Sequence, residues 1–355
     1  MGTREKILWW ATKRRVAIDK PYIIAIGGGI AKTSTKVILG EVLKLAFPGQ
    51  VRVGYGNLNT FIGVPLAALG FNVDFHKQRI GIFGWILILK MAILKGFFSK
   101  LPKYLILEYG TDQPGDIEKL VGTLPPDMAL LTIITEAHVA NYGSMEKVAQ
   151  DESRLVAAVK AEGTVIINKK DSYIGQYRTE IIAKKIVEVD TVPELIARNF
   201  ASAAAKVLGI NDEIIKQALS KPIAASGRFE IKKLDKYHLI DDSYNANPAS
   251  MEAALNVLAK SPGRKIAVLG TMLELGEDAE KLHKRVGEKA GKVADVVIGV
   301  GDMAQNYHPT KIFPNSELAA QGIFTYIREG DSILVKGSRG VRMEKIVEGI
   351  VNHGI

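Results

Sequence analysis

The sequence contains no cysteine among its 355 residues, and this absence excludes several kinds of site. Disulfide bridges, cysteine-ligated zinc ribbons and thiol nucleophiles all require that side chain. The sequence also shows no internal repeat, no low-complexity tract and no uncharged apolar run long enough to span a bilayer. Its first residues lack the apolar core and cleavage site of a signal peptide, because the charged residues Arg4, Glu5 and Lys6 come early. The cytoplasm is therefore the expected location.

What is present is the composition of an ordinary globular protein, with 47% hydrophobic and 24% charged residues. The length corresponds to roughly two to three domains. The 47 basic and 38 acidic residues give a net charge of +9. This surplus suits phosphate-bearing ligands, an anionic membrane surface or simply a basic cytosolic protein. Nucleic acid is a weaker expectation, because the basic residues are dispersed rather than gathered on one aromatic-interleaved face.

Two segments combine basic with aromatic or apolar residues. Residues 1–20 carry Trp9 and Trp10 among lysines and arginines, and residues 80–98 join an apolar run to Lys90 and Lys95, with Lys100 just beyond. Each is interpreted first as a helix that packs on the domain or is covered by a partner. The alternative is a peripheral contact with the inner face of the membrane, since lysine and arginine beside tryptophan are typical of helices that lie on anionic lipid. The sequence leaves both interpretations open.

The segment Tyr22–Lys36 has the order of a phosphate-binding P-loop. An isoleucine-rich run predicts a buried strand, a glycine triplet at residues 27–29 ends it, and Lys32 and Thr33 open a stretch with helical spacing. Glycines let backbone N–H groups crowd around a phosphate, and a helix N-terminus adds partial positive charge. Ala31 stands where the usual pattern has glycine, and an alanine there is crowded if its φ is positive. A plain glycine turn is the alternative.

Further strands end in polar residues near this loop. The strand Tyr104–Glu108 ends in a carboxylate, which is where a Walker-B type magnesium ligand occurs, and the strand at residues 128–134 leads to His138. Strands alternate with helices, which predicts a doubly wound, mostly parallel α/β sheet. Ligands gather at the carboxyl ends of such strands, so Glu108 and His138 are expected near Lys32.

The character of the chain changes near residues 221–227, and a second α/β unit follows. Its strands are predicted at residues 238–241, 265–269, 296–300 and 332–335. Its loops carry Asp, Tyr, Asn, Lys and Arg, as expected for a surface that closes over a nucleotide. We therefore expect a P-loop ATP-binding domain at residues 1–223 and a smaller, Rossmann-like α/β domain at residues 224–355.

Seven motifs follow one another between about residues 22 and 350: AIGGGIAKTSTK, GNLNTFIGVPL, LEYGTDQPGDI, AHVANYGS, DDSYNANPASM, LGTMLELGE and LVKGSRGVRMEKIV. In content and order they resemble the Mur ligase family. The resemblance implies a ligase that uses ATP to convert a substrate carboxylate into an acyl phosphate. The amine of an amino acid or dipeptide then attacks that carbonyl, in the synthesis of peptidoglycan precursors. The protein would contribute mainly positioning and charge neutralisation.

The resemblance implies ATP and Mg²⁺ as cofactors and assigns roles to residues. Those that would hold the nucleotide phosphates are Gly28, Gly29, Lys32, Thr33, Ser34 and Arg228. Those that would contact ribose and adenine are Asp242, Tyr244 and Asn245. Those that would bind metal are Thr33, Glu108, His138 and Glu152. Catalysis would involve Lys32, His138 and Lys336, and the substrates would face Ser338 and Arg339. Without the family context, these loops would be interpreted as solvated charge and Asn-Pro turns.

Four features depart from the family pattern. The segment that grips a UDP-sugar has no counterpart before the P-loop, Ala31 replaces a glycine, and Ile133 stands where the family has an asparagine. Glu152 aligns with a lysine that the family carbamoylates to make a metal ligand. A glutamate supplies similar charge and oxygen donors from a shorter arm, so Glu152 is interpreted as a built-in replacement. A surface glutamate at a site without a second metal is the alternative.

Three functions follow from the sequence. The favoured one is an active ligase whose carboxylate substrate need not be held through UDP. A lipid-linked substrate, and a partner that supplies the absent domain, are options within this hypothesis. The second is a catalytically impaired, nucleotide-binding scaffold or subunit. The third is a ligase of another branch that forms poly-amino-acid or other amides. ATP turnover that depends on an added amine would separate the second function from the others.

Overall fold

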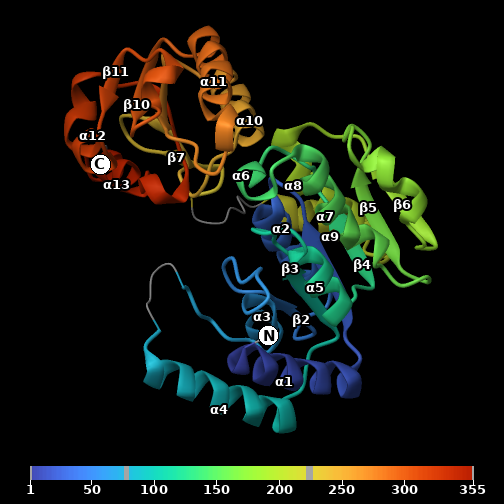
Figure 1. Ribbon diagram of the computed structural model, residues 1–355. Coiled ribbons are helices and arrows are strands. Elements are labelled where there is room, and N and C mark those ends of the chain that lie inside the picture. Colours follow the sequence, from blue (N-terminus) through green and yellow to red (C-terminus); the bar gives the residue numbers. More distant parts are fainter. Residues whose placement is uncertain (1, 76–79, 221–226, 354–355) are drawn as a thin grey trace. The chain divides into compact units, whose positions relative to one another are not determined.

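A computed structural model describes residues 2–75, 80–220 and 227–353 of the chain (Figure 1). Backbone contacts divide the chain into two units. Unit 1 comprises Met1–Ile134 and Met145–Ile223, and unit 2 comprises Thr135–Ser144 and Ala224–Ile355. The domain boundary expected after residue 223 falls within residues 221–226, outside the described part of the chain. Residues 135–144, expected in the first domain, cluster with unit 2.

In unit 1 the apolar runs form a parallel sheet in the order β2-β3-β1-β4-β5-β6. Its strands are β1 (Tyr22–Gly27), β2 (Val51–Val53), β3 (Tyr104–Glu108), β4 (Met128–Leu131), β5 (Thr164–Asn168) and β6 (Lys185–Val189). The inner strands β3, β4 and β5 are buried at every position, as expected for a sheet covered on both faces. The predicted doubly wound α/β fold is confirmed.

Helices cover this sheet on two faces, and the alternation along β1 shows which helix lies where. Ile24 and Ile26 pack in one cluster with residues of α2 (Lys32–Ala46) and α8 (Ile196–Val207), whereas the next position, Gly27, faces Leu155 of α7 (Met145–Ala157). The helices of unit 1 are α1 (Thr3–Asp19), α2 (Lys32–Ala46), α3 (Gly63–Ala68), α4 (Ile82–Phe98), α5 (Asp116–Thr123), α7 (Met145–Ala157), α8 (Ile196–Val207) and α9 (Asp212–Leu219). The shorter 3₁₀ helices are η1 (Ile174–Glu180) and η2 (Pro193–Leu195).

Unit 2 holds a second sheet in the order β11-β10-β9-β12-β8-β7, parallel except for the antiparallel pair β7 and β8. Its strands are β7 (Glu230–Lys233), β8 (His238–Asp242), β9 (Lys265–Gly270), β10 (Val296–Val300), β11 (Lys311–Phe313) and β12 (Ser332–Lys336). Its helices are α6 (Val139–Tyr142), α10 (Pro248–Ala259), α11 (Ala279–Val293), α12 (Ser316–Gly322) and α13 (Glu344–His353), with 3₁₀ helices η3 (Gly276–Asp278), η4 (Ala304–Tyr307), η5 (Ile323–Thr325) and η6 (Arg339–Val341). Residues of α10 and α11 join one apolar cluster, and residues of α12 and α13 join another.

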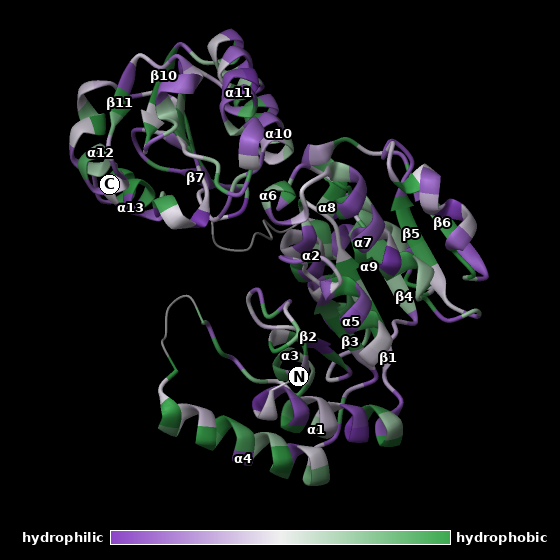
Figure 2. Ribbon diagram, in the orientation of Figure 1, coloured by the Kyte–Doolittle hydropathy of each residue, from purple (hydrophilic) through white to green (hydrophobic). Residues whose placement is uncertain are grey.

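The helices α1 and α4 lie side by side outside the sheet of unit 1, and α4 is apolar along most of its length (Figure 2). The sequence predicted a helix in each segment, and both form. Among the residues that the structure describes, no helix is long and apolar enough to cross a membrane.

Candidate functional site

The loop between β1 and α2 lies at the carboxyl ends of the central strands, where parallel sheets bind ligands. Gly28 has φ +113°, and a Cβ added there would lie 2.2 Å from Thr132 Oγ1, so only glycine fits. The Thr132 hydroxyl lies 2.7 Å from the Ile30 oxygen and 3.0 Å from the Gly27 oxygen. Gly29 N donates to the Ile133 oxygen at 2.7 Å. The segment after β4 thus fixes the glycine loop by hydrogen bonds.

Ala31 occupies the N-cap of α2 with φ 61° and ψ 2°, which is the left-handed region. The sequence predicted crowding at Ala31 if its φ were positive, and the structure shows a positive φ. A side chain costs about 1–2 kcal/mol in that region, whereas glycine adopts it without penalty. The helix nevertheless begins in register, since Thr35 N donates to the Ala31 oxygen at 2.8 Å. The backbone of the loop follows a P-loop path, and the strain is local to Ala31.

The predicted cation and carboxylate side chains of unit 1 meet at this loop. Lys32 Nζ donates to the Gly28 oxygen, so its ammonium lies over the loop. Thr33 Oγ1 donates to Glu108 Oε2 at 2.8 Å, and Glu108 Oε1 accepts from Asn59 at 3.2 Å. Ser34 follows, half-buried, in the first turn of α2. A hydroxyl beside a buried carboxylate is the donor set that Mg²⁺ uses together with phosphate oxygens.

Lys36 is a residue of this site that the sequence reasoning missed. Its Nζ lies 3.1 Å from Glu108 Oε2 and also donates to the Gly56 oxygen, and both charged side chains are 2% exposed. The signal was present, because Lys32 and Lys36 are four residues apart and share one helix face. A buried ion pair therefore supports the carboxylate at the end of β3.

Glu152 reaches the same loop from α7. Its Oε2 accepts a hydrogen bond from Gly28 N at 3.0 Å, and the residue is 3% exposed. It is therefore not on the surface. Within the described ranges, no group of three or more histidine, aspartate or glutamate side chains could hold a metal ion. The donors of unit 1 thus fit a magnesium ion that completes its shell with phosphate oxygens and water, rather than a cage made only of protein.

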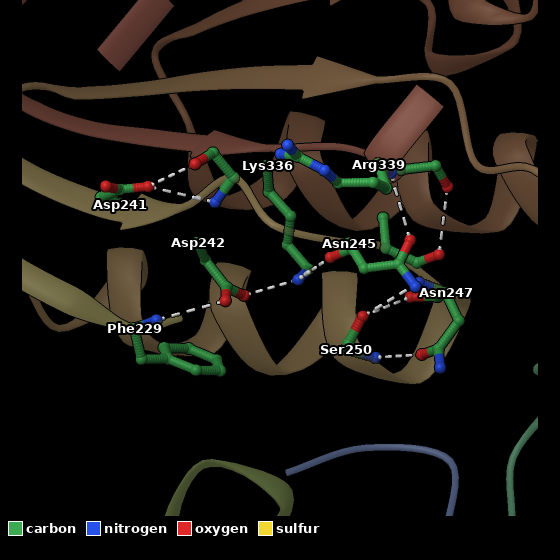
Figure 3. Close-up of polar contacts among 11 residues, drawn as sticks. Phe229, Asp241, Asp242, Asn245, Asn247, Ser250, Lys336 and Arg339 are labelled. Carbon is green, nitrogen blue, oxygen red and sulfur yellow. Dashed lines mark hydrogen bonds and ion pairs between the residues drawn. The ribbon is translucent and has the colours of Figure 1, made fainter. Parts of the chain in front are cut away.

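In unit 2 the ends of β8 and β12 bring Asp242 and Lys336 together, because the two residues are partners in the parallel register (Figure 3). Lys336 Nζ lies 2.5 Å from Asp242 Oδ2 and 2.9 Å from the Asn245 oxygen, and Phe229 N donates to Asp242 Oδ1 at 3.2 Å. Burial raises the pKa of Asp242 and lowers the pKa of Lys336, and their ion pair opposes both shifts. Asp242 is therefore engaged within the protein.

The other predicted residues of unit 2 surround this pair. Asn245 Oδ1 accepts from Arg339 N at 3.3 Å, which joins the loop after β8 to that after β12 (Figure 3). Ser338 Oγ accepts from Leu273 N at 2.9 Å. The guanidinium carbons of Arg228 and Arg339 lie 4.0 Å and 5.5 Å from the centre of the Tyr244 ring. Two cations and an aromatic ring thus gather where a nucleotide base or phosphate could bind.

The Asn-Pro part of the motif has a structural role of its own. Asn247 caps α10, because its side chain accepts from Ser250 N at 2.9 Å (Figure 3). Pro248 takes the first helical position. The interpretation as Asn-Pro turn chemistry therefore describes part of this loop, and the neighbouring Asp242, Tyr244 and Asn245 carry the polar contacts.

His138 lies in the segment that clusters with unit 2, whereas Thr33, Glu108 and Glu152 belong to unit 1. His138 has φ 61°, and its Nδ1 lies 2.7 Å from Glu274 Oε2. The hydrogen bond from His138 lowers the pKa of Glu274, although partial burial opposes the shift. Glu274 was not singled out from the sequence, although it belongs to the quoted motif LGTMLELGE.

Comparison with known proteins agrees with this arrangement. The family model "Mur ligase middle domain" matches residues 90–220, and "Mur ligase, glutamate ligase domain" matches residues 227–339. A UDP-N-acetylmuramoyl-tripeptide–D-alanyl-D-alanine ligase of Buchnera aphidicola is 28% identical over 93% of this chain and 75% of its own length.

Two solved structures share the fold. MurF from Acinetobacter baumannii has a TM-score of 0.81 and 24% identity, and the match covers 99% of this chain and 81% of that one. MurF ligase from Thermotoga maritima in complex with ADP has a TM-score of 0.80 and 22% identity, with 99% and 84% covered. With both family domains matched in order across the two units, the chain belongs to the Mur ligase family.

Proposed function

We propose that this chain is an ATP-dependent carboxylate–amine ligase of the MurF type that acts in peptidoglycan precursor synthesis. The observation that carries the proposal is the loop after β1, where Gly28 leaves no room for a side chain and Lys32, Thr33 and Glu108 converge. The names of the relatives, which are D-alanyl-D-alanine ligases of a UDP-linked tripeptide, support the same reaction. The ADP complex of a structural neighbour supports ATP as the phosphate donor.

In unit 1 the residues would hold and neutralise the phosphates. Lys32 would move its ammonium from the loop carbonyl to the outer phosphates, while the N–H groups of the first turn of α2, including that of Ser34, face them. Thr33 and Glu108 would bind Mg²⁺, which neutralises charge on the transferred phosphoryl group. Glu152 would fix the loop through Gly28 and offer a carboxylate to the metal.

In unit 2, Arg228 and Tyr244 would contact the nucleotide, and the loop of Asp242 and Asn245 would position them. The substrates would meet Lys336, Ser338 and Arg339, where positive charge stabilises the acyl phosphate and the oxyanion of the tetrahedral intermediate. His138 would act at the metal or on the transferred phosphate. The domains would thus be an ATP-binding unit and a unit whose residues contact nucleotide and amine.

We place the reaction in the cytoplasm, and a peripheral contact with the inner face of the membrane stays a prediction. A lipid-linked carboxylate substrate, and a partner that supplies the grip on a UDP-sugar, stay predictions.

Calorimetry with ATP and Mg²⁺ on the wild type and on Lys32→Ala tests the proposal. We expect micromolar binding in the wild type and a loss of at least tenfold in the variant. Lys44→Ala is the matched control, because Lys44 is an exposed lysine on the same helix. Phosphate release that requires both UDP-linked tripeptide and D-alanyl-D-alanine would then support the ligase. No ATP binding in the wild type would refute the proposal.

The second candidate is a nucleotide-binding scaffold, favoured by the strained Ala31 and by the carboxylate of Glu152 at the loop. It predicts ATP binding without turnover under any combination of amine and carboxylate substrates.

A further inference from the structure

The outward face of α4, with Trp10 and Ile18 of α1, forms an apolar surface on unit 1, called here the α1–α4 surface. On α4, Phe83 is 87% exposed and Phe98 is 82% exposed. The large apolar side chains exposed on the two helices are Trp10, Ile18, Ile82, Phe83, Ile86, Leu87, Met91, Ile93, Leu94, Phe97 and Phe98. An exposed apolar area of this kind marks an interaction site rather than an ordinary protein surface.

The exposed apolar side chains of α4 belong to a helix that packs on α1 of unit 1. Only Trp85, Ala92 and Gly96 of α4 are buried, and these lie on one stripe of the helix. A Cβ at Gly96 would lie 3.1 Å from Ala11 Cα of α1, so the helices touch closely. In turn, α1 is fixed to the unit by Trp9, whose Nε1 donates to the Phe61 oxygen at 2.8 Å. The opposite side of α4 is thus presented outward on a rigid support (Figure 2).

The charges around the α1–α4 surface have one sign. The exposed charged residues on α1, on α4 and directly after them are Arg4, Lys6, Lys13, Arg14, Lys20, Lys90 and Lys100. The two carboxylates of α1 are used internally: Glu5 accepts from Gly2 N at 2.7 Å, and Asp19 pairs with Arg15 at 2.5 Å. The partner that fits is therefore apolar where it meets α4 and anionic around it.

We propose that the α1–α4 surface binds the surface of an anionic lipid bilayer, with α4 lying along the interface. A second copy of this chain is disfavoured, because two such surfaces would place basic residues opposite one another. Lys90 lies within the outward face of α4, and its long side chain can bury its methylene groups while its ammonium reaches lipid phosphates. The proposal concerns where the protein is held and does not depend on its proposed ligase reaction.

Co-sedimentation of the full chain with vesicles tests this proposal. Equal parts of phosphatidylglycerol and phosphatidylcholine form the anionic vesicles, and phosphatidylcholine alone forms the neutral ones. Each basic residue near an anionic surface adds about 1 kcal/mol of attraction, which is about fivefold in binding. With several such residues, we expect at least a tenfold preference for anionic vesicles that weakens with salt. Trp10, which is 42% exposed, should shift its fluorescence to the blue on binding.

The apolar contact is tested by a triple variant, Phe83→Gln, Leu87→Gln and Leu94→Gln. All three side chains are exposed, so the change spares the core. We expect at least a tenfold loss of vesicle binding with ATP binding unchanged, because the variant leaves the glycine loop intact.

The matched control makes the same change at three exposed apolar residues of unit 1 outside this surface, Leu45→Gln, Ile182→Gln and Leu195→Gln. It should bind vesicles as the wild type does. A charge variant, Lys13→Gln with Lys90→Gln, should lose much of the preference for anionic vesicles.

Three results would overturn the proposal: no binding to either vesicle, equal binding to neutral and anionic vesicles, or undiminished binding of the triple variant. Sedimentation velocity on the same samples tests whether a second copy of the chain covers the α1–α4 surface instead. A dimer that the triple variant abolishes, without vesicle binding, would assign the surface to a second copy of the chain. ATP binding is measured in parallel, because it tests the ligase proposal independently of binding at the α1–α4 surface.

Discussion

The ion pair between Lys36 and Glu108 joins α2 to β3, the strand that ends in the expected magnesium ligand. The substitution Lys36→Met removes one partner of this pair. The two charged groups are 3.1 Å apart and both side chains are 2% exposed. Breaking a buried ion pair in this way costs about 3–5 kcal/mol, because the other charge stays buried without its partner. Thr33 and Asn59 still donate to Glu108, so we expect the lower end, about 3 kcal/mol.

The expected loss of stability can be measured by scanning calorimetry of the full chain. In a unit of this size, 1 kcal/mol corresponds to about 2–4 °C, so the melting temperature of unit 1 should fall by about 6–12 °C. Lys44→Met is the matched control on the same helix, and it should change stability by less than about 0.5 kcal/mol because Lys44 is exposed.

The double variant Lys36→Met with Glu108→Gln separates charge from packing. Since neither buried charge then remains, most of the lost stability should return, to within about 1 kcal/mol of the wild type. A single variant that melts within 2 °C of the wild type would refute the electrostatic reasoning. A double variant as unstable as the single one would show that the loss comes from packing of the Lys36 side chain.

Three more predictions concern single residues. Ala31→Gly should stabilise unit 1 by about 0.5–1 kcal/mol, because it removes a left-handed side chain at some entropic cost; a lower melting temperature would contradict this. Glu152→Gln should melt within about 2 °C of the wild type, since the amide oxygen can still accept from Gly28 N, yet lower magnesium-dependent ATP turnover at least tenfold; unchanged turnover would make Glu152 purely structural. Burial lowers the pKa of His283, whose Nε2 accepts from Met272 N. The folded pKa therefore lies below the unfolded one, and unit 2 should lose stability as pH falls below about 6.5, by up to about 1.4 kcal/mol per pH unit. Denaturation at several pH values should show a flatter dependence in His283→Gln, and an unchanged slope would disprove the assignment.

The central strands could be predicted because each holds a short, mostly apolar run, as in β3 and β5, which are buried at every position. The four edge strands β2, β6, β7 and β11 were not predicted. β2 and β11 have three residues each, and no position in β2, β6 or β7 is fully buried. The predicted strand at residues 128–134 ends early, at Leu131, because Thr132 turns its hydroxyl to the glycine loop. Short or half-exposed strands are defined by their neighbours, which the local sequence does not contain.

Only the part of the candidate site that lies in local motifs could be predicted from the sequence. Order along the chain was enough to place Lys32 and Thr33 after β1, because the motif is local. The pair of Asp242 and Lys336 required the register of β8 with β12, which joins residues far apart in sequence. The pairing of Lys36 with Glu108 likewise depends on how α2 crosses the sheet. The amphipathic segments predicted helices, but only the packing of α4 on α1 decides which of its apolar side chains stay exposed.

The departures from the family pattern alter the glycine loop less than the sequence suggests. The side chain at Ile133 is unusual, but the contact that this residue makes with the loop is its backbone oxygen, which accepts from Gly29 N at 2.7 Å. Any residue supplies that oxygen. Glu152 holds Gly28 N, and Thr132 holds the loop carbonyls. These bonds keep the course of the loop even though Ala31 is strained. The departures therefore cost stability at Ala31 and add a carboxylate at Gly28. Turnover by the wild type separates ligase from scaffold, and turnover by Glu152→Gln tests whether the added carboxylate serves the reaction.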